Sequence, residues 1–86
     1  SLVAVMEYAR QINARSIMIK GYRGRTILSN GEALTEREGL AELRAKEAAN
    51  LLQGAGLTSP EYVVTWDDEP QTGDASQRRI EISVDP

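Results

Sequence analysis

The sequence predicts a small α+β fold, a two-layer sandwich in which helices cover one face of a mixed sheet. Two segments carry apolar residues at the spacing of helices, and three show the composition or alternation of strands. In chain order they are helix 2–13, strand 16–20, helix 40–53, strand 62–66 and strand 79–84. A chain of 86 residues buries one modest core, so we expect a single domain over residues 1–86.

The first helix shows an apolar stripe that includes Leu2, Val5 and Ala9. It starts almost at the first residue, so we expect a preceding element to be missing. Residues 16–20 follow as a strand that ends at Gly21. Both of its faces are apolar, which predicts a central strand.

Residues 21–39 are interpreted as a long connection, because they contain four glycines and the turn pair Asn30-Gly31. Long connections in small domains often carry function, so we expect this one to be mobile and to border the same edge as Arg44. The alternative is a disordered insertion with a short helical turn near residues 34–38.

Residues 40–53 are rich in Ala, Leu, Glu, Lys and Arg, and Gly54 supplies the C-terminal stop. Spacing places Leu51 on the apolar face, where truncation to Ala should cost about 2–4 kcal/mol if the side chain is fully buried.

Two strands close the chain. Residues 62–66 form the first, and the acidic stretch Asp67-Asp68-Glu69 ends it and opens a polar loop to Ser76. Consecutive acidic side chains do not converge easily on one ion, so a solvated turn is favoured over a cation site. Residues 79–84 alternate, with Ile80, Ile82 and Val84 on the inner face and an antiparallel neighbour expected.

Composition excludes several classes of function. The net charge of −3 disfavours generic binding to DNA or to an anionic membrane. The chain has no His and no Cys, which removes the commonest general base, thiolate metal sites and disulfides. No apolar run approaches the roughly 20 residues of a membrane helix. We therefore expect no enzyme, no cofactor, no metal, no nucleic-acid partner and no direct membrane insertion by this segment.

Arg44 is the most informative polar residue. At 100° per residue it falls inside the apolar arc of its helix, between Leu40 and Ala48. A guanidinium there must snorkel, form an ion pair or face a cleft. One interpretation is snorkelling or an ion pair with a nearby acid such as Glu42 or Glu47, and the other is contact with a ligand.

Several motifs resemble the OmpA-like (OmpA/MotB/Pal C-terminal) domain. Residues 17–22 resemble its central strand with the "GY/GH" opening, and residues 40–57 its "LSxxRA…L…G" helix and exit. Glu69-Pro70 partly resembles its "GExxP" loop, and residues 77–82 are similar to its "NRRVEI" last strand. The resemblance implies a β-α-β-α-β-β fold with a first strand before residue 2. It also implies a periplasmic or envelope location and non-covalent binding to the peptide stem of peptidoglycan.

The family holds a diaminopimelate residue between an Asp of its "GxTDxxG" loop and the Arg of "RA". By resemblance that Arg is Arg44, and the "RR" pair is Arg78 and Arg79. Tyr22 and Arg23 lie in the matching loop and complete the expected ligand-binding set. The Asp is absent, because Gly24 stands in its place.

Two functions remain open at this stage. One is weak binding of stem peptide, with the acid supplied by Glu32, Glu36 or Glu38 and a gain expected on Gly24→Asp. The other is a degenerate domain that serves protein–protein assembly in an envelope or secretion complex.

Overall fold

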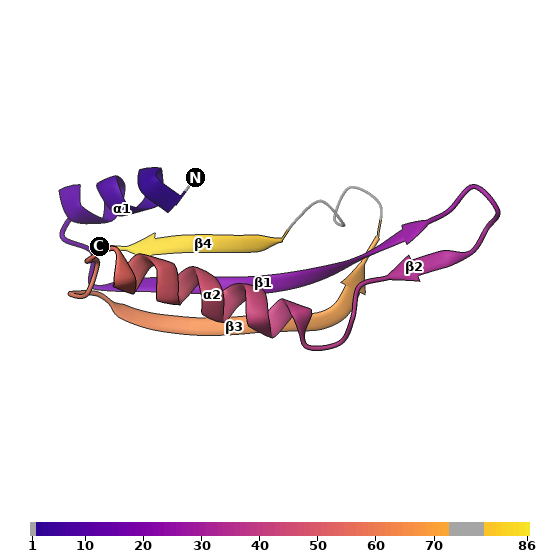
Figure 1. The fold of residues 1–86 in the computed structure, drawn as a ribbon. Helices are drawn as coiled ribbons and strands as arrows, with labels where there is room; N and C mark the ends of the chain where they lie inside the picture. Colours follow the sequence, from indigo (N-terminus) through magenta and orange to yellow (C-terminus); the bar gives the residue numbers. More distant parts are fainter. Residues whose placement is uncertain (1, 73–78) are drawn as a thin grey trace.

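The computed structural model describes residues 2–72 and 79–86, and its element content confirms the α+β class. The elements, in chain order, are α1 (Leu2–Gln11), β1 (Ser16–Ile27), β2 (Ala33–Thr35), α2 (Leu40–Gly54), β3 (Glu61–Gln71) and β4 (Ile80–Asp85). Figure 1 shows the two helices and the mixed sheet.

β1 is the central strand of the sheet, as the sequence predicted. β3 runs parallel to it, with Ile17 opposite Tyr62. β4 lies antiparallel on the other side, with Ile17 opposite Val84, which confirms the expected antiparallel neighbour. Past the first residue of β4, Ile80, the same side of β1 pairs with β2, with Arg25 opposite Thr35. One long strand therefore organises the whole sheet.

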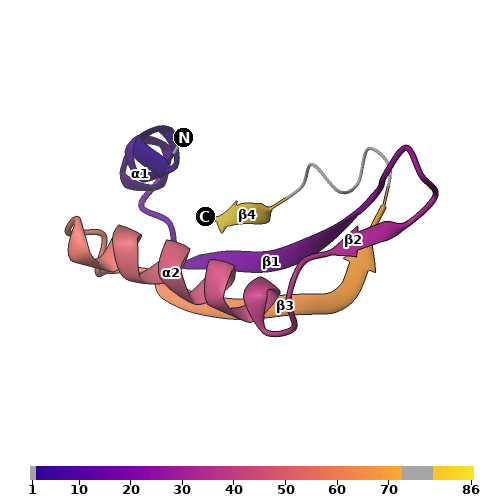
Figure 2. The same cartoon turned by 45° about the vertical axis from the view of Figure 1, so that its right-hand side comes forward.

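The core lies between one face of the sheet and both helices. Ile17 and Ile19 are fully buried and pack in a cluster with Ala9 of α1 and Leu52 of α2. Figure 2 shows the same layers after a 45° turn. Met18 lies on the opposite face and is largely exposed. The apolar character of both faces of residues 16–20 therefore predicted the right strand position, although only one face is covered.

α2 approaches β1 closely because the facing residues are small. Its buried residues are Ala41, Ala45, Ala48, Ala49 and Leu52. A Cβ atom added at Gly21 would lie 1.9 Å from the backbone oxygen of Ala41. Gly21 therefore belongs to the helix–strand contact and does not end the strand, which corrects the sequence prediction.

The predicted burial of Leu51 is wrong. Its side chain is 62% exposed, whereas Leu52 is fully buried. The apolar stripe of α2 is built mainly from alanines, and Leu51 lies outside it although its spacing fits an apolar face.

α1 covers β4 at the edge of the sheet. Leu2 and Val5 meet Ile80 and Ile82 around a shallow apolar hollow. Ile80, Ile82 and Val84 are half-buried against the core, which confirms the predicted inner face of the last strand.

The predicted long connection over residues 21–39 is wrong for most of its length. β1 continues to Ile27, and β2 returns as a hairpin in which Leu28 N–H donates to the Glu32 carbonyl at 2.7 Å. The Asn30-Gly31 pair is the hairpin turn, with Gly31 at a φ of 86°. The hairpin extends past the N-terminal end of α2 (Figure 1). Its strand residues 25–27 and 33–35 are therefore exposed on both faces. That missing hydrophobic signal is why the sequence indicated a loop.

The predicted end of the second strand at Asp67 is also wrong, because β3 runs to Gln71. The pairing with β1 shifts register between Tyr22 and Gly24, opposite residues 67–71. Such an irregularity tolerates Pro70, which cannot donate a backbone hydrogen bond to the sheet. The acidic residues interrupt regular pairing without ending the strand.

Candidate functional site

Arg44 lies on the second turn of α2, beside the point where β1 leaves the cover of the helices. Its Nη1 donates to the Tyr22 backbone oxygen at 2.9 Å. The side chain is 20% exposed, so the guanidinium is held at the surface of the core. The guanidinium therefore contacts β1, on the side of the helix that the position of Arg44 in the apolar arc indicated.

The partner of Arg44 is Glu36, which lies between β2 and α2. Arg44 Nη1 donates to Glu36 Oε1 at 2.8 Å and Nη2 donates to Oε2 at 2.6 Å. The two parallel bonds form the bidentate geometry that makes Arg–carboxylate pairs strong. Neither local acid of the predicted ion pair, Glu42 or Glu47, takes this position, and Glu42 pairs with Lys46 instead.

A backbone donor completes the contacts of the Glu36 carboxylate. Gly24 N–H donates to Oε1 at 2.6 Å. Three donors therefore surround one carboxylate, two from the guanidinium and one from the main chain. We call the Arg44 guanidinium and the Gly24 amide the carboxylate cradle. Sequence reasoning missed the Gly24 donor, because a backbone amide leaves no signal in the residue type.

The cradle keeps Glu36 ionised. The hydrogen bonds from Arg44 lower the pKa of the Glu36 carboxyl from 4.5 to about 2. Partial burial opposes this shift, while the Gly24 amide and the charges of Arg44 and Arg79 add to it. The same hydrogen bonds raise the pKa of Arg44. Both partners are therefore ionised throughout the neutral pH range, Glu36 as a carboxylate and Arg44 as a guanidinium cation.

Arg23 holds the chain around the cradle. Its Nε donates to the Asp68 backbone oxygen at 2.6 Å, and its Nη1 donates to the Glu36 backbone oxygen at 2.9 Å. Arg23 thus ties β3 and the segment after β2 to β1. The sequence analysis placed Arg23 in the ligand-binding set. In the structure both of its hydrogen bonds go to backbone oxygens, those of Asp68 and Glu36.

Three predicted site residues remain. Arg79 is exposed, and its side chain lines a hollow of about 370 Å³ with Gly24 and Glu36. Tyr22 contributes its backbone oxygen to Arg44, and its ring lies 5.4 Å from Lys20 Nζ. Arg78 lies outside the described residues.

The hollow beside the cradle is polar on several sides. Thr26, Thr35 and Leu34 from the hairpin complete its lining. Its lining includes one acidic and one basic side chain, Glu36 and Arg79. The predicted proximity of residues 21–39 to Arg44 is confirmed, because Tyr22, Gly24 and Glu36 all come from this segment.

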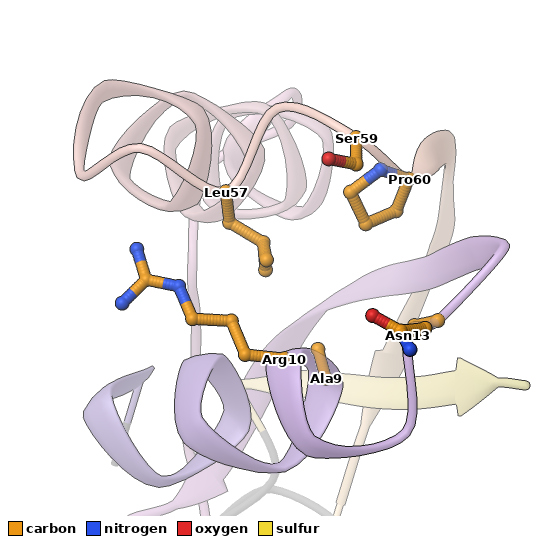
Figure 3. A pocket seen from close by; sticks show the side chains of 7 residues that line it. Ala9, Arg10, Asn13, Leu57, Ser59 and Pro60 are labelled. Carbon is orange, nitrogen blue, oxygen red and sulfur yellow. The ribbon is translucent and has the colours of Figure 1, made fainter.

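A second cavity lies near the C-terminal ends of both helices. Figure 3 shows Arg10 and Asn13 facing Leu57, Ser59 and Pro60. The cavity between them has a volume of about 170 Å³. None of the predicted site residues lines it. Its polar lining residues are Arg10, Asn13 and Ser59, and no side-chain hydrogen bond or ion pair joins any two of these described residues.

Within residues 2–72 and 79–86, no three acidic side chains gather as a metal site would require. Neither described helix has the length and apolarity needed to cross a bilayer.

Comparison with known proteins found no matching family model, curated protein or solved structure.

Proposed function

We propose that this chain is a non-catalytic cell-envelope module, similar to the OmpA-like domain, that binds the peptide stem of peptidoglycan weakly. The observation that carries the proposal is the carboxylate cradle. Arg44 is the residue that the resemblance assigns to the ligand carboxylate, and it binds a carboxylate here, that of Glu36. A site that holds one carboxylate bidentately has the geometry to hold another.

The ammonium group of a stem residue would meet Glu36. Of the three acids left open by the sequence, Glu36 alone contacts the cradle in the described structure, whereas Glu32 lies at the hairpin turn. A zwitterionic ligand that enters between Glu36 and Arg44 gives each charge a new partner. Carboxylate then meets Arg44, ammonium meets Glu36, and no charge is left unpaired.

Binding is weak in this proposal because the ligand must break an existing ion pair. Charged hydrogen bonds contribute about 1.5–3 kcal/mol each, so losing one is equivalent to roughly ten- to a hundredfold in affinity. An acid at position 24 would lie beside Glu36 and repel it, since Glu36 already binds the Gly24 amide. The gain expected for Gly24→Asp therefore requires removal of the Glu36 carboxylate as well.

Sedimentation with purified peptidoglycan sacculi tests the proposal. The native protein should sediment partially with sacculi, and Arg44→Ala should remain in the supernatant. Arg15→Ala is the matched control, because it removes the same charge from an exposed position at the opposite end of β1. Equal sedimentation of all three proteins would contradict a role for Arg44, and no sedimentation of the native protein would contradict the function.

Protein–protein assembly in an envelope complex is the second candidate, and the β1–β2 hairpin favours it. Ile27, Leu28 and Leu34 are exposed there, with Leu34 at 64%. Neighbouring exposed apolar residues on a projecting element are typical of interaction surfaces. A photocrosslinking residue at position 34 should capture a defined partner in cells, whereas the same residue at position 51 should not. Leu51 is the control because it is equally exposed on α2.

A further inference from the structure

The contacts of Glu36 divide into two sets that use different atoms. Its backbone N–H donates to the Gly24 oxygen at 2.9 Å, and its backbone oxygen accepts from Arg23 at 2.9 Å. Only the side-chain carboxylate occupies the cradle. The position of residue 36 is therefore fixed without the carboxylate, and truncating the side chain should leave the cradle assembled.

Arg44 is likewise held without Glu36. Its Nη1 also donates to the Tyr22 oxygen, and its helix packs on β1 through Ala41 and Ala45. The Gly24 amide belongs to the β1 backbone. An empty cradle would thus present two guanidinium N–H groups and one amide N–H around a partly buried, electropositive space.

We propose that the Arg44 guanidinium and the Gly24 amide form a receptor for a free carboxylate, and that Glu36 is its tethered occupant. Small monocarboxylates enter the receptor once the tethered carboxylate is removed. This inference goes beyond the stem-peptide proposal, because it concerns any small carboxylate and holds even if the chain does not bind peptidoglycan.

The tether explains how the native chain excludes such ions. A group on a short tether acts at an effective concentration of millimolar or more, and the fixed backbone of residue 36 favours the high end of this range. A free carboxylate that displaced Glu36 would also leave the Glu36 charge without its partner. Acetate should therefore bind the native protein at least about tenfold more weakly than a variant without the occupant.

Glu36→Ala with acetate is the direct test, because this substitution removes a methylene and a carboxylate, and acetate supplies a carboxylate with one methyl group. Thermal unfolding is compared in sodium acetate and sodium chloride of equal ionic strength at pH 7. Acetate should raise the midpoint of Glu36→Ala and leave the native midpoint unchanged. In ¹⁵N spectra of Glu36→Ala, the Gly24 amide resonance should shift on titration with acetate.

Two variants act as controls. Glu36→Ala/Arg44→Ala should show no acetate effect, because the two guanidinium donors of Arg44 are absent. Glu36→Gln should show a smaller effect than Glu36→Ala, because its amide occupies the space but offers one acceptor oxygen where the carboxylate offers two. If Glu36→Ala does not fold in chloride, refolding in acetate is the readout. An acetate effect of equal size in the double variant, no effect in Glu36→Ala, or no folding in either salt would overturn the proposal.

Discussion

Glu36 and Arg44 form the ion pair that connects the hairpin segment to the helix, and its energy depends on pH. The pKa of Glu36 is lowered in the folded state to about 2, from 4.5. A carboxyl with a lowered pKa stabilises the fold above its unfolded pKa and loses this contribution as pH falls through the folded value. The contribution is therefore complete above pH 4.5 and disappears between 4.5 and about 2.

This pH dependence gives a prediction for Glu36→Gln. The native protein should lose more free energy of unfolding than Glu36→Gln between pH 5 and pH 2, with a difference of about 1–2 kcal/mol after allowance for solvent screening. Urea unfolding at several pH values measures it. Parallel pH curves for the two proteins would show that the pair contributes no net stability.

Gly21 allows the close contact of α2 with β1. In Gly21→Ala, the new Cβ would overlap the backbone oxygen of Ala41, and backbone atoms cannot move aside cheaply. We expect a loss of about 1–3 kcal/mol, as is typical of overpacking. Gly54→Ala is the control, since a Cβ there meets no atom within 4 Å and its φ is not positive. It should be neutral or slightly stabilising by chemical denaturation.

Leu51 and Leu52 are adjacent residues that differ in burial. Leu52→Ala should cost about 2–5 kcal/mol, because it opens a cavity in the core, whereas Leu51→Ala should cost less than about 1 kcal/mol. Denaturant midpoints of the two variants make the comparison. Equal losses would mean that the helix face is assigned wrongly.

At the scale of elements, β1 has two parts that differ in how many strands pair with them. Residues 16–21 pair with β3 on one side and β4 on the other. Residues 25–27 pair with the short β2 and extend beyond the helices. Amide hydrogen exchange should therefore be at least about tenfold slower for residues 17–20 than for residues 26–28, because local opening of the hairpin exposes little apolar surface. Equal protection factors would show that the hairpin opens only with the core.

The elements also show what sequence patterns can and cannot predict. Both helices and the alternating last strand were predictable, because each has one buried face that imposes a period on the sequence. The central strand was predictable for another reason, since residues 16–20 are apolar on both faces. The hairpin was not, because it has no buried face. Gly21 was wrongly interpreted as the end of the strand. A glycine is needed there because β1 and α2 pack closely, and not because the chain turns.

For the candidate site, Arg44 was predictable from its position in an apolar arc. Its partner was not predictable, because Glu36 reaches it through the hairpin, and the path of that hairpin depends on tertiary structure. The Gly24 amide was likewise invisible in the sequence. A pattern can thus identify a charge that needs a partner without identifying the partner.

At the scale of the whole molecule, the fold is elongated, with extents of 49 × 20 × 18 Å. The helices and the core occupy one end, and the hairpin projects from the other (Figure 2). The carboxylate cradle lies where the two parts meet, since Arg44 comes from the covered part and Glu36 follows the hairpin. A ligand at the cradle would therefore contact both parts at once.

In the proposed function, Arg44 exchanges its bond to Glu36 for a ligand carboxylate. Titration calorimetry with a diaminopimelate-containing stem-peptide fragment tests it most directly, on the native protein, Arg44→Ala and the exposed control Arg15→Ala. We predict weak binding to the native protein and to Arg15→Ala, and a loss of at least about tenfold in affinity for Arg44→Ala. Tight binding by the native protein that survives Arg44→Ala would contradict the claim.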